Sequence, residues 1–142
     1  MKNLKTIVLE DAKKAISCME KECFELKIEG SFCILDCMGN VIILEKMDNA
    51  SPATLKIAEA KAITALKTFI STKEVDCLIR DKGVVPEYFA GVFNSAVWGG
   101  FPLYEKKTDI IPAGSIGVSG GTWEQDEAIA MAGIKALGFI IK

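Results

Sequence analysis

The sequence predicts a single α+β domain in which helices pack on the faces of an antiparallel sheet of about five strands. Two observations favour this class. Stretches with helical and with strand periodicity follow one another along the chain, and the clearest pair of strands is joined by a short turn, as in an antiparallel hairpin. A chain of 142 residues supports one well-buried core, so we expect residues 1–142 to form one domain without an internal linker.

The first third of the chain predicts a helix followed by a β-hairpin. Between residues 9 and 27, apolar residues recur every three or four positions among lysines and glutamates, which indicates an amphipathic helix that Gly30 ends. Segments 31–36 and 41–44 are typical of strands, and Gly39 suits the left-handed position of the turn between them. Because few polar residues alternate along these strands, we expect both of their faces to be covered.

A long helix is predicted to begin at Ser51 and Pro52, a favoured N-cap and a favoured first helical residue, and to continue to about residue 70. At about 100° per residue, Lys61 falls between the solvent face and the core face of this helix. Its charge therefore needs a partner or a wet cavity, unless its flexible stem carries the ammonium group into solvent. The solvent face holds Lys56, Glu59 and Lys67, and the core face holds Leu55, Ala58, Ala62, Ala65, Leu66 and Phe69.

The middle of the chain combines a short helix with a cluster of aromatic residues. Ser71 and Glu74 form a predicted capping box before a short helix at 75–80. Six of the eleven aromatic residues then fall within the uncharged segment 88–104. Such a density is typical of a lid over the core or of the apolar wall of a pocket for a flat ligand.

Glycine-rich turns frame the remaining strands. We expect residues 99–102 to form a turn between a strand ending near Trp98 and a short strand at 103–105. The last strand is predicted at 112–118, and the closing helix at 122–137. This helix is nearly free of charge in its second half, so most of its sides should be buried.

The turn before the last helix carries the most specific local signal in the chain. Thr122 and Gln125 form a capping box that fixes the start of the helix. Two glycines just before a helix also let backbone N–H groups bind a carboxylate or phosphate. The opposing interpretation is purely structural, because three acids of the first turn already complement the positive end of the helix dipole: Glu124, Asp126 and Glu127.

Charge and hydropathy exclude several classes of protein. The net charge is −2, and the 17 basic residues form no stripe that would neutralise phosphates, which argues against nucleic-acid binding. The N-terminus becomes charged before an apolar region of signal-peptide length can form, and the longest uncharged run contains glycines and a proline. We therefore expect a soluble cytoplasmic protein that neither spans nor binds a membrane.

Cysteine and hydrophobic content point to two further properties. Five cysteines without a C-x-x-C pair, and no histidine, predict reduced and buried structural thiols and no metal site. Hydrophobic residues make up 50% of the chain, which is high for a monomer of this length. We expect part of this surface, including the last helix, to form the interface of a homo-oligomer.

Short motifs along nearly the whole chain resemble those of the GlcG/HbpS-like family, which includes the C-terminal domain of PduO-type proteins. The most specific is the segment 116–121 with 124–128, which spans the glycine turn and the start of the last helix. The other motif residues are 9–12, 36–39, Met47 and Asp48, Ile57 and Ala58, Lys61 and Ala62, Thr64 and Ala65, and 99–103.

The resemblance implies a profilin-like sheet, assembly into homo-oligomers and an association with small-molecule catabolism. Some family members bind haem, and a histidine is the expected iron ligand in them. This sequence has no histidine, so Tyr, Cys or Met would have to take that place. PduO-type proteins also suggest corrinoid adenosyltransfer, but that chemistry is attributed to a separate helical domain, and this chain has no phosphate-gripping motif.

Two classes of function remain. The favoured one is a protein that binds haem, another tetrapyrrole or a small organic acid. The alternative is a small catabolic enzyme that uses acid–base chemistry, with Lys61 and Asp48, Asp126 or Glu127 as the catalytic candidates. The predicted ligand-binding residues are Lys61, Trp98, Gly99, Gly100, Ser119, Gly120, Gly121 and Thr122.

Overall fold

The computed structural model describes residues 3–142. Met1 and Lys2, the start of the segment searched for an export signal, lie outside the described residues. The chain forms the helices and strands α1 (Leu9–Leu26), β1 (Ser31–Asp36), β2 (Val41–Lys46), α2 (Pro52–Thr68), α3 (Thr72–Lys82), the 3-10 helix η1 (Pro86–Phe89), β3 (Gly100–Leu103), β4 (Gly114–Ser119) and α4 (Trp123–Ala136).

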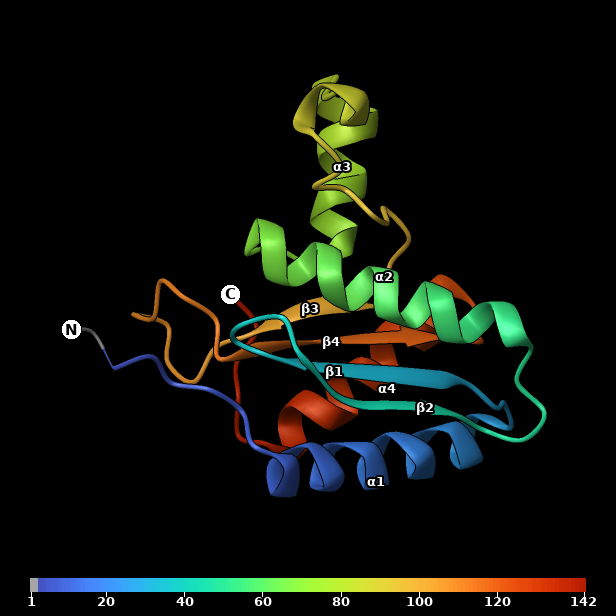
Figure 1. Cartoon of the computed structure of the whole chain (residues 1–142). Coiled ribbons are helices and arrows are strands. Elements are labelled where there is room, and N and C mark those ends of the chain that lie inside the picture. The colour runs from blue at the N-terminus through green and yellow to red at the C-terminus, as the bar shows by residue number, and fades with distance from the viewer. Residues whose placement is uncertain (1–2) are drawn as a thin grey trace.

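These elements form three layers around one antiparallel sheet (Figure 1). The strand order is β2-β1-β4-β3. Helix α2 covers one face of the sheet, while α1 and α4 cover the other. Helix α3 and the segment that follows it project away from the sheet on the side of α2 (Figure 1). The α+β class and the helices on both faces of the sheet are thus confirmed.

The prediction of about five strands is wrong, because residues 3–142 form four strands. No strand ends near Trp98, and the segment expected to be a turn instead contains β3, which pairs with β4. Pro102 is tolerated there because β3 is an edge strand, where a missing N–H breaks no ladder bond. Of the strand expected at 103–105, Leu103 is the last residue of β3, and Tyr104 forms an isolated bridge with Ile140.

Glycines bring α2 unusually close to the sheet. A Cβ on Gly117 would lie 2.0 Å from the carbonyl oxygen of Ala58, and one on Gly100 would lie 2.6 Å from that of Lys61. The two glycines are paired across β3 and β4. The backbone of α2 therefore packs directly against the strands, and this contact fixes the position of Lys61 over the end of the sheet.

Local signals placed most other boundaries correctly. The hairpin forms with Gly39 at φ +88°, and the Thr122–Gln125 capping box is present in both directions. At α3, Ser71 accepts a hydrogen bond from the Glu74 backbone N–H, which is one of the two bonds of the expected capping box, and the helix begins earlier than predicted. Helix α1 ends at a left-handed Lys27 rather than at Gly30.

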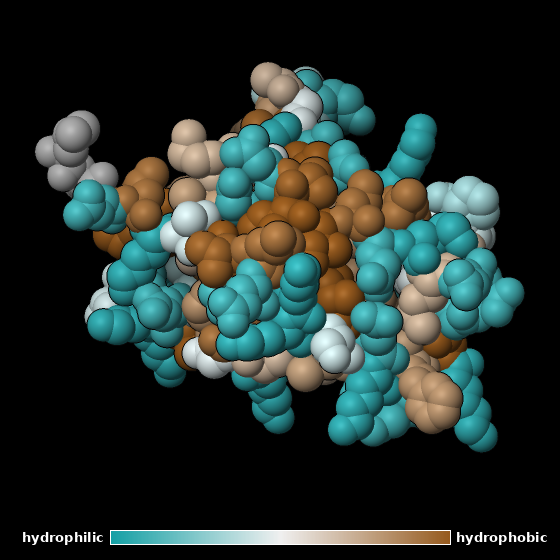
Figure 2. Space-filling model, turned by 60° about the horizontal axis from the view of Figure 1, so that its bottom comes forward, coloured by the Kyte–Doolittle hydropathy of each residue, from teal (hydrophilic) through white to brown (hydrophobic). Residues whose placement is uncertain are grey.

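Two expectations of burial are wrong. Strand β1 is buried, but β2 is an edge strand whose Val41 and Leu44 are 49% and 37% exposed. Figure 2 shows a central area of hydrophobic side chains on the side where α1 and β2 lie.

Of the five cysteines, Cys18 and Cys77 are exposed, Cys37 is intermediate, and Cys23 and Cys33 are buried. Burial raises the pKa of the Cys23 thiol to about 11 and that of Cys33 to about 12, which keeps both protonated.

Candidate functional site

Lys61 is the largest polar side chain of the interior, and none of its surface is exposed. It projects from the middle of α2 toward the end of β4. Its Nζ donates hydrogen bonds to the carbonyl oxygen of Val118 at 2.6 Å and to Oδ2 of Asp126 at 3.0 Å. The lysine is therefore held by protein acceptors and does not carry its head group into solvent.

Asp126 connects this lysine to the glycine turn. Its Oδ1 accepts a hydrogen bond from the backbone N–H of Gly121 at 2.8 Å, while Oδ2 faces Lys61. The carboxylate lies in the first turn of α4, where the helix dipole favours negative charge. Lys61 and Gly121, the two donors expected to hold an acidic ligand, thus already bind Asp126.

Burial shifts both members of this pair toward their neutral forms. Loss of solvation lowers the pKa of Lys61, and the attraction of Asp126 opposes that shift. Loss of solvation likewise raises the pKa of Asp126, against the attraction of Lys61 and the hydrogen bond from Gly121. Proton transfer within the pair therefore costs less than it would between the same groups in water.

Three glycines near the pair have packing roles. A Cβ on Gly99 would lie 3.1 Å from Lys61 Nζ and 2.7 Å from the Val118 carbonyl oxygen, and its φ of +119° also favours glycine. Gly120, at φ +143°, lies against the Gly30 backbone, where a Cβ would approach Cα to 2.6 Å. Gly100 packs on α2 as described above.

A cavity of about 570 Å³ borders the pair. This is within the usual size range for a small-molecule site, roughly 300–1,000 Å³. Lys61, Ser119 and Asp126 provide its polar side, and Trp123 forms an aromatic wall. The irregular segment 94–97 also lines the cavity, and Ile57 and Ala60 of α2 add apolar surface.

The structure brings together only part of the predicted site. Lys61, Ser119, Gly121 and Asp126 border the cavity, and Gly99 lies beside the lysine. Trp123, Ile57 and Ala60 were not predicted; a tryptophan directly after the Thr122 N-cap was the available signal. Residues 94–97 belong to the segment 88–104, for which the wall of a pocket was one of two interpretations. The remaining predicted residues, Asp48, Trp98, Gly100, Gly120, Thr122 and Glu127, do not line the cavity.

The side chains that do not line the cavity are exposed to solvent or make other contacts. Asp48 is exposed in the connection between β2 and α2. Thr122 caps α4. Glu127 is nearly buried, which raises its pKa, and it lies 3.9 Å from Lys73 of α3. Trp98 donates its indole N–H to Asp76 at 3.0 Å.

Trp98 belongs to a cluster that joins α3 to the start of α4. Its ring centroid lies 5.4 Å from that of Trp123. Lys73 Nζ lies 4.5 Å from the Trp98 centroid, and Arg80 Cζ lies 5.5 Å from the Trp123 centroid, as in cation–π contacts. Arg80 also pairs with Asp76. This cluster holds Trp123 as a fixed wall of the cavity.

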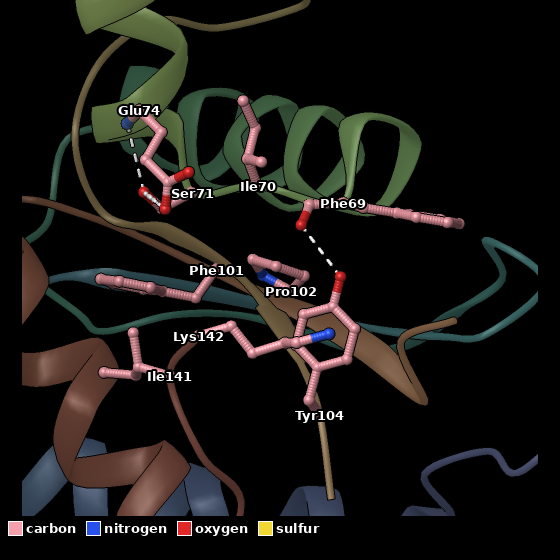
Figure 3. A pocket seen from close by; sticks show the side chains of 9 residues that line it. All are labelled: Phe69, Ile70, Ser71, Glu74, Phe101, Pro102, Tyr104, Ile141 and Lys142. Atoms are coloured by element: carbon pink, nitrogen blue, oxygen red, sulfur yellow. Dashed lines mark hydrogen bonds between the residues drawn. The ribbon is translucent and has the colours of Figure 1, made fainter. Parts of the chain in front are cut away.

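A second cavity, of about 230 Å³, lies at the β3 edge (Figure 3). Tyr104 donates its hydroxyl to the carbonyl oxygen of Phe69, and Ser71 accepts the Glu74 backbone N–H at its rim. The polar groups of this cavity bind backbone atoms at the end of α2 and the start of α3 or belong to the C-terminal Lys142. The lining contains no buried charged pair. The cavity beside Lys61 is therefore the better candidate site.

Neither a metal centre nor a membrane span is found within residues 3–142. No group of three or more His, Cys, Asp or Glu residues there could hold a metal ion. No helix in the same range is long and apolar enough to cross a bilayer.

The fold and the site define a small α+β domain with a buried lysine–aspartate pair beside a ligand-sized cavity. A family model described as haem degrading protein HbpS-like matches residues 7–135. The chain belongs to the HbpS-like family. It is 30% identical over 129 residues to an uncharacterized 15.0 kDa protein from the dhaT-dhaS intergenic region of Citrobacter freundii, with 88% of this chain and 87% of that protein covered.

Solved structures confirm the fold. The crystal structure of Klebsiella pneumoniae ORFY has a TM-score of 0.85 at 25% identity, covering 96% of this chain and 94% of that one. Crystalline HbpS has a TM-score of 0.81 at 26% identity, covering 97% and 94%. A PduOC–haem complex has a TM-score of 0.83 at 24% identity, covering 95% and 97%, and shares the fold.

Proposed function

We propose that this chain is a small-ligand-binding protein whose ligand occupies the cavity between α2, the segment 94–97 and Trp123. The observation that carries this proposal is the buried Lys61–Asp126 pair at the border of that cavity. A desolvated pair beside an apolar space orients a polar group of a ligand while the surrounding surface covers the rest of it. The association with small-molecule catabolism is part of the same proposal.

The family and the PduOC–haem complex suggest a tetrapyrrole as one ligand class. The residues at this cavity do not fit an axial role toward haem iron. The described lining contains no histidine, tyrosine, cysteine or methionine, and its lysine amine already binds Asp126. We therefore propose a small organic molecule as the ligand, and we expect any haem binding to be weak and without a histidine ligand.

A second candidate function is acid–base catalysis by Lys61 and Asp126. The specific observation in its favour is that burial shifts the pKa of each group toward the other's range. Glu127 and Asp48 are less suited to this role, because neither borders the cavity. A small organic acid as ligand would have to displace Asp126 from Lys61, which makes a neutral polar ligand the better match.

The proposal predicts that filling the cavity abolishes ligand binding. Ala60→Trp places an indole into the space from α2, whereas the matched control Ala53→Trp adds the same group at an exposed position of that helix. We expect the wild type and Ala53→Trp to retain a ligand in native mass spectrometry, or to gain thermal stability from a panel of metabolites and ferric haem. Ala60→Trp should lose at least about tenfold in affinity.

The same measurements can also contradict the proposal. If Ala60→Trp folds and binds every positive ligand as tightly as Ala53→Trp does, the cavity is not the site. A stoichiometric haem complex with the Soret spectrum of histidine ligation would contradict the expectation for haem.

A further inference from the structure

We infer that the hydroxyl of Ser119 is the hydrogen-bonding anchor for the ligand in the cavity beside α2, and that this ligand is a neutral alcohol with a flat apolar body. The inference rests on the proposed function, because it concerns the same cavity, and it adds the chemical class of the ligand and the residue that selects it. Three features support it: the direction of the Ser119 side chain, its unpaired hydroxyl, and a lining whose two charges pair with each other.

Ser119 points from the end of β4 toward α2. Successive side chains of a strand point to opposite faces, and the neighbouring Val118 packs in the core between the sheet and helices α1 and α4. Ser115, four residues earlier and on the same face as Ser119, donates its hydroxyl to the carbonyl oxygen of Ala62 in α2 at 2.7 Å. The Ser119 side chain therefore lies on the α2 face of the sheet, where α2 borders the cavity.

The Ser119 hydroxyl has no partner within residues 3–142. The residue is only 6% exposed, and its oxygen makes no hydrogen bond in that range. In the same range, Glu45 Oε2 is the one buried side-chain oxygen or nitrogen that has neither a hydrogen bond nor appreciable accessible surface. The Ser119 oxygen therefore keeps accessible surface, and the space beside it is the cavity that Ser119 lines. A ligand in the cavity can reach this hydroxyl.

The chemistry of the hydroxyl favours an alcohol as its partner. A buried hydroxyl without a hydrogen bond is costly, because folding has removed it from water. A serine hydroxyl donates one hydrogen bond and also accepts, and the hydroxyl of an alcohol does the same. The two groups can therefore pair whichever oxygen is the donor, whereas the oxygen of a ketone or an ether can only accept.

The charges of the lining do not favour a charged ligand. Lys61 and Asp126 bind each other at 3.0 Å, and the second oxygen of Asp126 accepts the Gly121 N–H. A carboxylate or an ammonium group would lose its hydration here without meeting an opposite charge that is free to pair. A neutral ligand avoids that cost. The other polar side chains of the lining are neutral as well: Asn94, Ser95 and Ser119.

The rest of the lining suits a flat apolar body. The Trp123 ring is held in place, because its centroid lies 5.4 Å from that of Trp98 and 5.5 Å from Arg80 Cζ. A fixed indole ring packs well against another flat ring. The other apolar side chains of the lining are Ile57, Ala60, Ala96 and Val97.

The test compares three probes that share one ring and differ in one group: benzyl alcohol, toluene and benzoate. Each probe is titrated into the isotope-labelled whole chain, and binding is followed by the NMR signal of the Trp123 indole N–H. The variant Trp98→Phe assigns this signal, because it removes the indole signal of Trp98. We expect benzyl alcohol to bind at least about fivefold more tightly than toluene or benzoate, because only its hydroxyl pairs with Ser119 without bringing a charge.

Substitution of the serine tests the anchor itself. In Ser119→Ala, we expect toluene to bind about as tightly as benzyl alcohol, because the partner of the hydroxyl is gone. Ser115→Ala is the matched control, since it removes a hydroxyl from the same face of β4 that binds Ala62 and does not line the cavity. This variant should keep the preference for benzyl alcohol. The NMR spectra report whether each variant is folded, and the preference of the wild type decides the inference even if Ser119→Ala does not fold.

The outcomes separate this inference from the proposed function. Equal binding of benzyl alcohol and toluene by the wild type would overturn the inference, and so would a preference that Ser119→Ala retains. Tighter binding of benzoate, or no response to any of the three probes, would overturn the neutral alcohol as the ligand class. The proposed function is tested separately, by the comparison of Ala60→Trp with Ala53→Trp, and it stands if a ligand of another class is lost only in Ala60→Trp.

Discussion

At the scale of single residues, Lys61 illustrates what a helical projection contains and what it omits. The angle along α2 indicates that this lysine belongs to neither face, and the structure confirms that it needs a partner. The projection could not choose among Asp48, Asp126 and Glu127, because the partner depends on where α4 begins relative to α2. That relation is set by the close contact of α2 with the sheet, which involves residues far apart in sequence.

Removing the lysine charge should destabilise the protein. Lys61→Met keeps most of the aliphatic stem but leaves Asp126 buried without its partner, so we expect a loss of about 3 kcal/mol or more in the free energy of unfolding. Urea denaturation measures this loss. The double variant with Asp126→Leu should recover part of it, because no uncompensated charge remains. If Lys61→Met leaves stability nearly unchanged, the pair is not an important structural contact, and an acid-binding lysine becomes the better interpretation.

At the scale of elements, the best predictions rest on local rules. Residues next to each other in sequence decide the hairpin turn at Gly39 and the caps of α3 and α4, and all three form. The segment around Gly100 was misread, because its glycines serve the approach of a helix rather than a turn. Local sequence does not reveal that difference. The polar side of the site was therefore partly predictable, whereas its wall at 94–97 was predicted only as part of the segment 88–104 and not by residue.

The close approach of α2 to the sheet predicts that a substitution at Gly117 lowers the stability of the protein strongly. A Cβ there would meet the Ala58 oxygen at 2.0 Å and the Ala62 nitrogen at 2.7 Å, both backbone atoms that cannot move alone. Gly117→Ala should therefore destabilise by about 3 kcal/mol, at the upper end of overpacking costs. Gly133→Ala is the matched control, since its Cβ would meet side-chain atoms only, of Met19 at 2.9 Å and of Ile116 at 3.1 Å, and the alanine gains helix propensity. Equal melting temperatures for the two variants would contradict the argument.

At the scale of the whole molecule, the two edges of the sheet differ. The β3 edge carries Pro102, and the Tyr104–Ile140 bridge covers the chain beyond it. The β2 edge has neither protection and presents apolar residues to solvent. Helix α4, in which we had expected part of an interface, already buries Ile129, Ala130 and Ile134 in the core of one chain. Val41 and Leu44 thus give this open edge apolar surface for contact, while other exposed hydrophobic residues, among them Phe24, Tyr88 and Ile110, lie outside β2.

Self-association is therefore expected to depend on β2. With one open edge, two chains can pair β2 to β2 about a two-fold axis, which closes the assembly and prevents growth into fibres. In sedimentation velocity at micromolar concentration, we expect the wild type to be oligomeric and Val41→Lys combined with Leu44→Lys to shift toward monomer. Phe24→Lys is the control, because Phe24 is 82% exposed on α1 and should leave the assembly intact. A wild-type monomer would refute self-association, and an oligomer that survives the β2 substitutions would place its interface on another surface.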